Sequence, residues 1–230
     1  MSIELTVTTK SNMYIGGTPQ TFEIGGVDMY TATDYDGKPY IPASSFKGAL
    51  KEIVKDNYDE KIANIYKEYL GKVRSKFEEK IQYCKEKGEL KEDNEKRKND
   101  YQKRIDDNDK ILHTCLFGIE GFNNSPKLIF NDLELREDFT DSGKWFSIDM
   151  KTSIEEQENY TLKSNPRSYK TARKGLVFKG RINFYRVREL GEDAENEIKI
   201  YLEKCLKEFN TGIYRIGNSK SRGYGWIEVE

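Results

Sequence analysis

The sequence contains very few of the residues that most metal sites and disulfide frameworks require. Among its 230 residues there is one histidine, His113, and there are three widely spaced cysteines, Cys84, Cys115 and Cys205. A single histidine excludes most zinc sites, histidine-based triads and ribonuclease mechanisms that use two histidines. Three distant cysteines form no disulfide framework. We interpret His113 as a packed or solvated residue.

Long hydrophobic runs are also missing. No window approaches the about 18 apolar residues of a membrane span, and the first residues, MSIELTVTTK, hold no apolar signal-peptide core. We therefore expect a cytoplasmic protein with no membrane partner. Acidic and basic residues number 40 and 39, so the net charge of −1 indicates no partner by itself.

Hydrophobic periodicity predicts an α+β fold. We expect helices that begin at Ala43 and that span 192–209, and strands over 2–9, 127–135, 145–148, 176–187 and 224–229. This order of elements is the βαββαβ order of a ferredoxin-like (RRM-like) domain. We expect one such domain over residues 1–230, with two insertions.

A very polar segment interrupts this core. Residues 51–110 hold 17 basic and 16 acidic side chains. Apolar residues recur every three or four positions over 59–87, which predicts one long amphipathic helix, and Gly88 ends it. Because 91–112 is helical by composition, we expect a helical-hairpin insertion over 56–112. Its near-neutral charge favours a spacer or protein-contact arm over an RNA-binding arm.

A glycine-rich loop, GNSKSRGYG at 217–225, is the strongest local motif. Glycines allow an anion to approach the backbone, and neighbouring amides, hydroxyls and bases can hold a phosphate. The loop is not a P-loop, because it lacks GxxxxGKS/T and precedes a strand. An ordinary hairpin turn is the alternative. The candidate residues are Gly217, Ser219, Lys220, Ser221, Arg222 and Gly223.

A basic segment lies between 161 and 188, with nine bases and no acid. Tyr169 and Tyr185 alternate with the bases, a composition that suits phosphate contacts combined with base stacking. A solvated charged surface is the alternative. We favour nucleic acid, because so long a stretch without acids is unusual in a chain that is 34% charged.

The helix that begins at Ala43 offers a third candidate. Its first turn holds Ser44 and Ser45, and Lys47 and Gly48 follow. Free amides and hydroxyls at a helix start attract phosphate. A simple helix cap with a packing glycine is the alternative.

Five motifs in order resemble the RAMP superfamily of CRISPR proteins. The resemblance is closest to the type III backbone subunit, the Csm/Cmr member of the Cas-seven family, and within it to the Csm type. The motifs are IGG at 15–17 with GGVD at 25–28, YIPASSFKG at 40–48, LFG at 116–118, NPR at 165–167 and SRGYG at 221–225. Two departures are Ala43, where the family usually has glycine, and Ile154-Glu155-Glu156, where it usually has IDR.

The resemblance implies a subunit that stacks with further copies of itself into a filament along a CRISPR guide RNA. It also implies contact with target single-stranded RNA and with other type III effector subunits, including the large polymerase-like subunit. A thumb insertion over 150–175 would separate guide and target and flip a nucleotide at regular intervals. The implied RNA-binding residues are Gly16, Gly17, Ser44, Ser45, Lys47, Gly48, Arg167, Lys170, Arg173, Lys174 and the glycine-loop residues named above.

The resemblance also implies a catalytic and metal-binding role for Asp28, with Mg²⁺ or Mn²⁺ bound transiently at the cleavage site. RNA supplies its own nucleophile, the 2′-hydroxyl, which a flipped base can align with the phosphate. A lone carboxylate is a weak Mg²⁺ site, so RNA phosphates would supply further ligands. A turn-capping role for Asp28 is the alternative, and Asp34 and Asp36 lie close by in the sequence.

Two other functions remain open at this point. One is a non-catalytic RNA-binding scaffold of the same architecture. The other is a CRISPR RNA processing endonuclease, a class that often uses histidine, for which His113 is a poor candidate.

Overall fold

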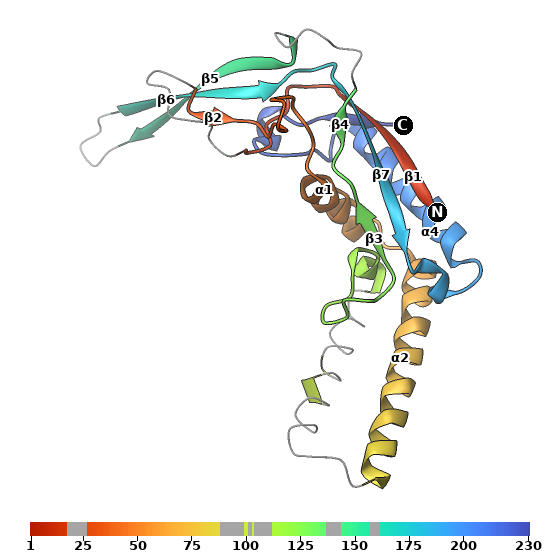
Figure 1. The fold of residues 1–230 in the computed structure, drawn as a ribbon. Helices are drawn as coiled ribbons and strands as arrows, with labels where there is room; N and C mark the ends of the chain where they lie inside the picture. The colour runs from red at the N-terminus through yellow and green to blue at the C-terminus, as the bar shows by residue number, and fades with distance from the viewer. Residues whose placement is uncertain (18–26, 88–98, 101–102, 104–111, 137–143, 157–161) are drawn as a thin grey trace. The chain divides into compact units, whose positions relative to one another are not determined.

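The computed structural model describes residues 1–17, 27–87, 99–100, 103, 112–136, 144–156 and 162–230 (Figure 1). The strands are β1 (Ser2–Thr9), β2 (Met29–Tyr30), β3 (Lys127–Phe130), β4 (Glu134–Leu135), β5 (Phe146–Glu156), β6 (Leu162–Ala172), β7 (Val177–Tyr185) and β8 (Ile227–Val229). The α-helices are α1 (Ala43–Asp56), α2 (Glu60–Glu86) and α4 (Ala194–Lys207). Short 3₁₀ helices are η1 (Leu112–Phe117), η3 (Val187–Leu190), η4 (Glu208–Thr211) and η5 (Lys220–Arg222). None of the described helices is long and apolar enough to cross a membrane.

The main sheet has the strand order of a ferredoxin-like domain. Its path is β3-β7-β1-β8, and β4 also pairs with β7. The first core strand therefore lies between the third and the fourth, and α1 and α4 follow the first and third strands in the chain. β1 and β8 are antiparallel, with Val7 opposite Val229. The predicted ferredoxin-like α+β fold is confirmed.

The prediction of a single strand over 127–135 was wrong. The structure separates β3 from β4, and between them Leu133 pairs with Ile41 in the segment before α1. The amide of Ile41 donates to the carbonyl of Leu133 over 3.0 Å, and the reverse bond measures 2.9 Å.

Contacts between Cα atoms divide the chain into two compact units. The first comprises Met1–Ser2, Lys51–Ile129 and Asn183–Cys205. Within it, α2 buries Ile62, Tyr66 and Leu70, and Asp59 caps the helix by accepting a 3.1 Å hydrogen bond from the amide of Ile62. The long amphipathic helix is thus confirmed. Most of the predicted second arm, 91–112, lies outside the described residues, so the helical hairpin stays a prediction.

His113 lies in this first unit. Its ring packs edge-on against Tyr58, with ring centroids 5.2 Å apart, and burial lowers the pKa of the imidazole. Both observations describe a packed, neutral side chain, as the sequence indicated.

The second unit comprises Ile3–Leu50, Phe130–Ile182 and Leu206–Glu230. Its core includes the buried side chains of Phe46, Leu50, Phe178 and Phe209. The Phe46 ring stacks on that of Phe209 at 5.5 Å between centroids. The spacing of apolar residues that predicted the start of α1 therefore corresponds to a face of the helix that is buried in this core.

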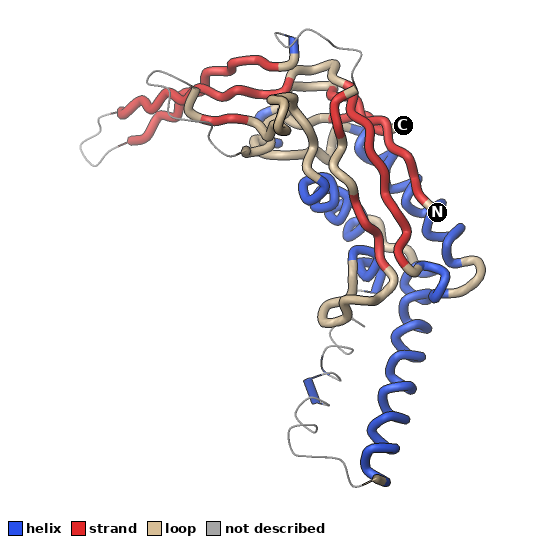
Figure 2. The backbone as a smooth tube through the Cα atoms, viewed as in Figure 1, coloured by secondary structure: helices blue, strands red, loops and turns tan. Residues whose placement is uncertain are grey.

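A small second sheet, ordered β2-β6-β5, projects within this unit (Figure 2). β5 and β6 form a long antiparallel hairpin that pairs from Phe146↔Ala172 to Glu156↔Leu162. β2 adds in parallel, with Met29 opposite Tyr169. The strand predicted over 145–148 thus continues to Glu156, because cross-strand pairing extends it beyond its apolar start.

Side chains alternate between the two faces of this sheet. The Asp28 face is defined by Ile148, Met150, Ser168 and Lys170, beside which Asp28 lies. The Tyr169 face is defined by Ser147, Asp149, Lys151, Arg167, Tyr169 and Thr171.

Candidate nucleic-acid interface

Asp28 lies at the start of β2 and is held by one residue of β6. Its Oδ2 accepts hydrogen bonds from the Ser168 amide at 2.6 Å and from the Ser168 hydroxyl at 2.9 Å. The Asp28 amide donates back to the Ser168 Oγ at 3.1 Å. The bonds from Ser168, together with the charge of Arg167, hold the pKa of Asp28 below its ordinary value. Asp28 is therefore an exposed, ionised carboxylate with a fixed orientation.

This carboxylate can hold a divalent cation only as one ligand among several. Within the described part of the chain, no donor reaches its Oδ1, and no three His, Cys, Asp or Glu residues converge on a possible metal position. Mg²⁺ keeps most of its water and accepts phosphate oxygens as ligands. Asp28 thus fits a hydrated Mg²⁺ or Mn²⁺ only where water and phosphate oxygens supply the other ligands.

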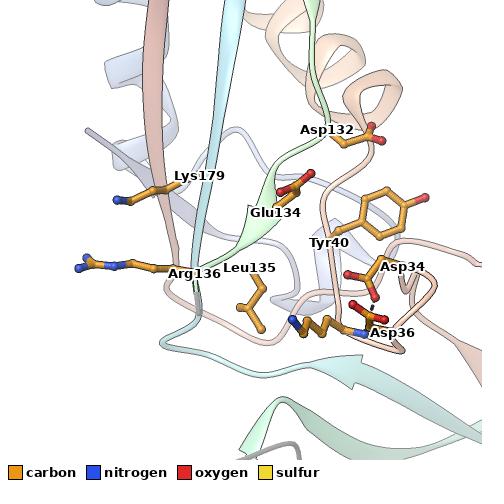
Figure 3. Close-up of a pocket in the computed structure, with 9 residues that line it drawn as sticks. Asp34, Asp36, Tyr40, Asp132, Glu134, Leu135, Arg136 and Lys179 are labelled. Carbon is orange, nitrogen blue, oxygen red and sulfur yellow. Dashed lines mark hydrogen bonds between the residues drawn. The ribbon is translucent and has the colours of Figure 1, made fainter. Parts of the chain in front are cut away.

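The two neighbouring aspartates have other surroundings. Asp34 closes a turn, because its Oδ1 accepts a 2.8 Å hydrogen bond from the Lys38 amide. Asp34 and Asp36 line a hollow of about 730 Å³. The other residues that line it are Lys38, Tyr40, Asp132, Glu134, Leu135, Arg136 and Lys179. Figure 3 labels all of these except Lys38.

One wall residue of this hollow caps α1. The Oδ1 of Asp132 accepts a 2.6 Å hydrogen bond from the amide of Ala43, the first residue of the helix. The first turn of α1, which the sequence predicted as a phosphate site, thus already donates a hydrogen bond to the Asp132 carboxylate of the same chain. Ser44 and Gly48 are exposed there, and Ser45 and Lys47 are half-buried.

The glycine loop is a tight turn with several left-handed residues. The φ angles of Gly217, Ser219, Gly223 and Gly225 are 80°, 59°, 92° and 75°. A Cβ on Gly217 would overlap the carbonyl oxygen of Tyr14, so glycine is required there both for its backbone angle and for space. The loop therefore depends on glycine for its shape, whatever it binds.

The same loop packs against the segment that carries Gly16 and Gly17. The amide of Asn218 donates to the Tyr14 carbonyl at 2.7 Å, and that of Gly225 to the Asn12 carbonyl at 2.9 Å. Gly17 in turn donates to the carbonyl of Tyr30 in β2 at 3.0 Å. Short backbone contacts thus join the glycine loop, the IGG segment and the strand after Asp28.

A second carboxylate, Asp149, joins the hairpin to the glycine loop. It accepts hydrogen bonds from Tyr224 at 2.7 Å, Ser147 at 3.0 Å, Thr171 at 3.1 Å and Asn12 at 3.2 Å. Burial alone would raise the pKa of Asp149, but these four donors outweigh it and hold the pKa below the ordinary value. Burial and the bond to Asp149 raise the pKa of the Tyr224 hydroxyl to about 12.

The comparisons with known proteins agree with this architecture. The model described as "RAMPs: RAMP superfamily" matches residues 6–228, nearly the whole chain. The chain belongs to the RAMP superfamily. No curated protein matches it.

One solved structure resembles this RAMP protein over its full length. It is titled "Cryo-EM structure of the Type III-B Cmr-beta bound to cognate target RNA", with a TM-score of 0.51 and 19% sequence identity. The alignment covers 100% of this chain and 58% of that chain. At this identity the match supports the fold of the RAMP chain.

The basic segment of the RAMP chain divides between two sheets. Arg167 and Lys170 lie on β6, and Arg173 and Lys174 follow it, whereas Lys179 lies on β7 and lines the hollow that also holds Asp34 and Asp36. Arg167, Arg173 and Lys174 are exposed. Lys170 is half-buried, with its Nζ 4.3 Å from the centroid of the Phe146 ring.

Sequence reasoning missed Asp149, Lys151, Ser168 and the role of Tyr224. Their partners lie far away in the chain: Asp149 and Tyr224 are 75 positions apart, and Asp28 and Ser168 are 140 apart. The only signal available was the position of Tyr224 inside the SRGYG motif.

Proposed function

We propose that this protein is a backbone subunit of a type III CRISPR RNA-guided effector complex. In this role it binds guide RNA and cleaves complementary target single-stranded RNA at regular intervals. RAMP membership, the order of the five motifs and the fold shared with a chain of a target-bound type III-B complex support the proposal. The observation that carries cleavage is Asp28, an exposed carboxylate that two hydrogen bonds from Ser168 orient beside β6.

The cleavage step uses the chemistry of RNA itself. A nucleotide flipped out at the hairpin aligns its 2′-hydroxyl with the adjacent phosphate. The hydroxyl loses its proton to water and its oxygen attacks the phosphorus. The bond from phosphorus to the 5′-oxygen of the next nucleotide breaks, and this oxygen takes up a proton. The products are a 2′,3′-cyclic phosphate and a 5′-hydroxyl. Asp28 is oriented by Ser168 and lies on the face that meets the scissile bond. Lys170, on the Asp28 face, contributes positive charge for the phosphates. A Mg²⁺ or Mn²⁺ bound at Asp28 would stabilise the negative charge that develops.

The partners follow from the same role. The subunit stacks with further copies of itself along the guide and assembles with other type III subunits, including the large polymerase-like subunit. The glycine loop, the IGG segment and the start of α1 hold the guide backbone. At α1, Asp132 competes with phosphate for the first amide, so we assign Ser44, Ser45 and Lys47 a smaller share of the binding.

A non-catalytic scaffold is the second candidate. The observation that favours it is that Asp28 stands alone, with no metal-binding cluster in the described residues. A processing endonuclease gains no support, because His113 is a packed side chain against Tyr58.

Filter binding of labelled RNA separates the two candidates. Wild type and Asp28→Ala should bind a matched target equally in the assembled complex, and only wild type should cut it. A target that stays bound and intact with wild type would support the scaffold.

A further inference from the structure

A lysine ammonium on the Tyr169 face has no counter-ion in the described structure. The Nζ of Lys151 lies 3.7 Å from the centroid of the Tyr224 ring and 4.7 Å from that of Tyr169. This nitrogen is buried and has no hydrogen-bond partner among the described residues. Aromatic faces attract a cation, but they replace only part of the hydration that a buried ammonium loses.

The nearest acid does not neutralise it. Asp149 forms no ion pair with Lys151, and its two oxygens accept the four hydrogen bonds from Asn12, Ser147, Thr171 and Tyr224. Burial first, and then the charge of Arg222, lower the pKa of Lys151 against the opposing effect of Asp149.

Two further cations border the same position. Arg222 is exposed in η5, two residues before Tyr224, and forms no side-chain ion pair within the described part of the chain. Arg167 lies directly opposite Lys151 across the hairpin and is exposed. Lys151 thus contacts two tyrosine rings, the charge of Arg222 acts on it, and Arg167 lies opposite it across the hairpin. Like charges held together in this way repel one another unless an anion lies between them.

We propose that Lys151, Arg167 and Arg222 form a phosphate-binding site for the backbone of single-stranded RNA on the Tyr169 face. The inference rests on the proposed function for the identity of the anion. The two exposed guanidinium groups contact the phosphate directly, which suits their forked donors. Lys151 lies buried against the rings and attracts the phosphate with a charge that the ions in solution screen only weakly. Tyr169 and Tyr224 offer ring surface beside the phosphate for a base.

Asp149 is a positioning residue for this site. Its bond to Tyr224 holds the glycine loop against β5, and Tyr224 in turn contacts Lys151. Arg222, two residues before Tyr224, thereby stays close enough for its charge to act on Lys151. The site therefore continues the phosphate path of the glycine loop onto the hairpin. The two faces of one small sheet then meet different parts of the RNA: the guide backbone on the Tyr169 face and the cleavage position on the Asp28 face.

The test measures the affinity of the full chain for a fluorescein-labelled 12-nucleotide uridine RNA at several salt concentrations. Lys151→Met keeps most of the length of the side chain and removes its charge. We expect about tenfold weaker binding and a salt slope reduced by about one. Lys151→Arg should retain most of the affinity. The matched control is Lys204→Met, a charge removed from an exposed position on α4, which should bind as wild type.

Two measurements keep the result interpretable if Lys151→Met unfolds or if the chain binds no RNA. Arg222→Gln changes an exposed side chain and should lower the affinity and the salt slope in the same way. Thermal melting with tripolyphosphate then tests the site without RNA. Stabilisation of wild type but not of Arg222→Gln, without RNA binding, would support the phosphate site and contradict the proposed function.

Other outcomes would overturn the site itself. Equal RNA affinity and equal salt slope in wild type, Lys151→Met and Arg222→Gln would contradict it while leaving RNA binding by the chain intact. Absence of both RNA binding and tripolyphosphate stabilisation in wild type would contradict the site and the proposed function together.

Discussion

Ser168 donates both its amide and its hydroxyl to one carboxylate oxygen of Asp28, at 2.6 and 2.9 Å. The opposite contact, from the Asp28 amide to the Ser168 Oγ, closes the pair. The carboxylate is thereby tied to β6 rather than to its own loop, and any movement of the hairpin moves it as well. The hairpin therefore holds Asp28 in place, although Asp28 lies 140 positions before Ser168 in the sequence.

Ser168→Ala should raise the pKa of Asp28 toward its ordinary value. The variant loses the hydroxyl bond and keeps the amide bond, so the rise should be partial. Carboxyl-carbon NMR titration of the two proteins measures it. Asp28 stays ionised at neutral pH in both proteins. A several-fold loss of cleavage in Ser168→Ala would therefore come from a changed orientation of the carboxylate. An unchanged pKa would show that the hydroxyl does not bond the carboxylate in solution.

Tyr224→Phe should lower the free energy of unfolding by about 1–2 kcal/mol, because one half-buried acceptor loses its donor. Urea unfolding measures the change. The matched control is Tyr35→Phe, since the Tyr35 side chain is fully exposed and should show no effect. Equal losses in both variants would show that the hydroxyl of Tyr224 does not matter.

Stability should depend on pH through Asp149. Its folded-state pKa is lowered, so the carboxylate stabilises the fold above its unfolded pKa of about 3.9, and this contribution is lost as the pH falls below that value. Urea unfolding at pH 7 and pH 3 should show a larger loss for wild type than for Asp149→Asn. The same loss in both would contradict the hydrogen-bonded, ionised state of Asp149.

Gly217→Ala should destabilise the chain much more than Gly37→Ala. Both glycines have similar left-handed angles, φ of 80° and 76°, so both variants incur a similar backbone penalty of about 1–2 kcal/mol. Only the Cβ at position 217 would overlap another group, the carbonyl of Tyr14, whereas position 37 is open. Thermal melting compares the two variants. Equal melting temperatures would contradict the close packing of the glycine loop on residues 12–17.

The elements that sequence reasoning found are those whose signal is local. The alternation in Ser2–Thr9 and the helical spacing from Phe46 and over Glu60–Glu86 predicted β1, α1 and α2 directly. β2 has only two residues, and β5 extends past its apolar start into charged sequence, because both depend on pairing with β6. The pattern of residues within one short segment cannot predict pairing with a distant strand.

The same limit applies to the candidate interface. Asp28 and the glycine loop were visible through motifs that resemble a known family. Ser168 and Asp149 were not, since their roles come from contacts with residues far away in the chain. In the sequence Lys151 is one of 79 charged residues with nothing to distinguish it. Its position close to two tyrosine rings follows only from the folded hairpin.

The most direct test of the central claim uses the complex assembled with a guide RNA. An end-labelled complementary RNA is incubated with Mg²⁺, with wild-type protein or with Asp28→Ala. The account predicts regularly spaced products with wild type, and with Asp28→Ala a target that stays bound and uncut. An uncut target held by wild type, or identical products from both proteins, would contradict the assignment of cleavage to Asp28.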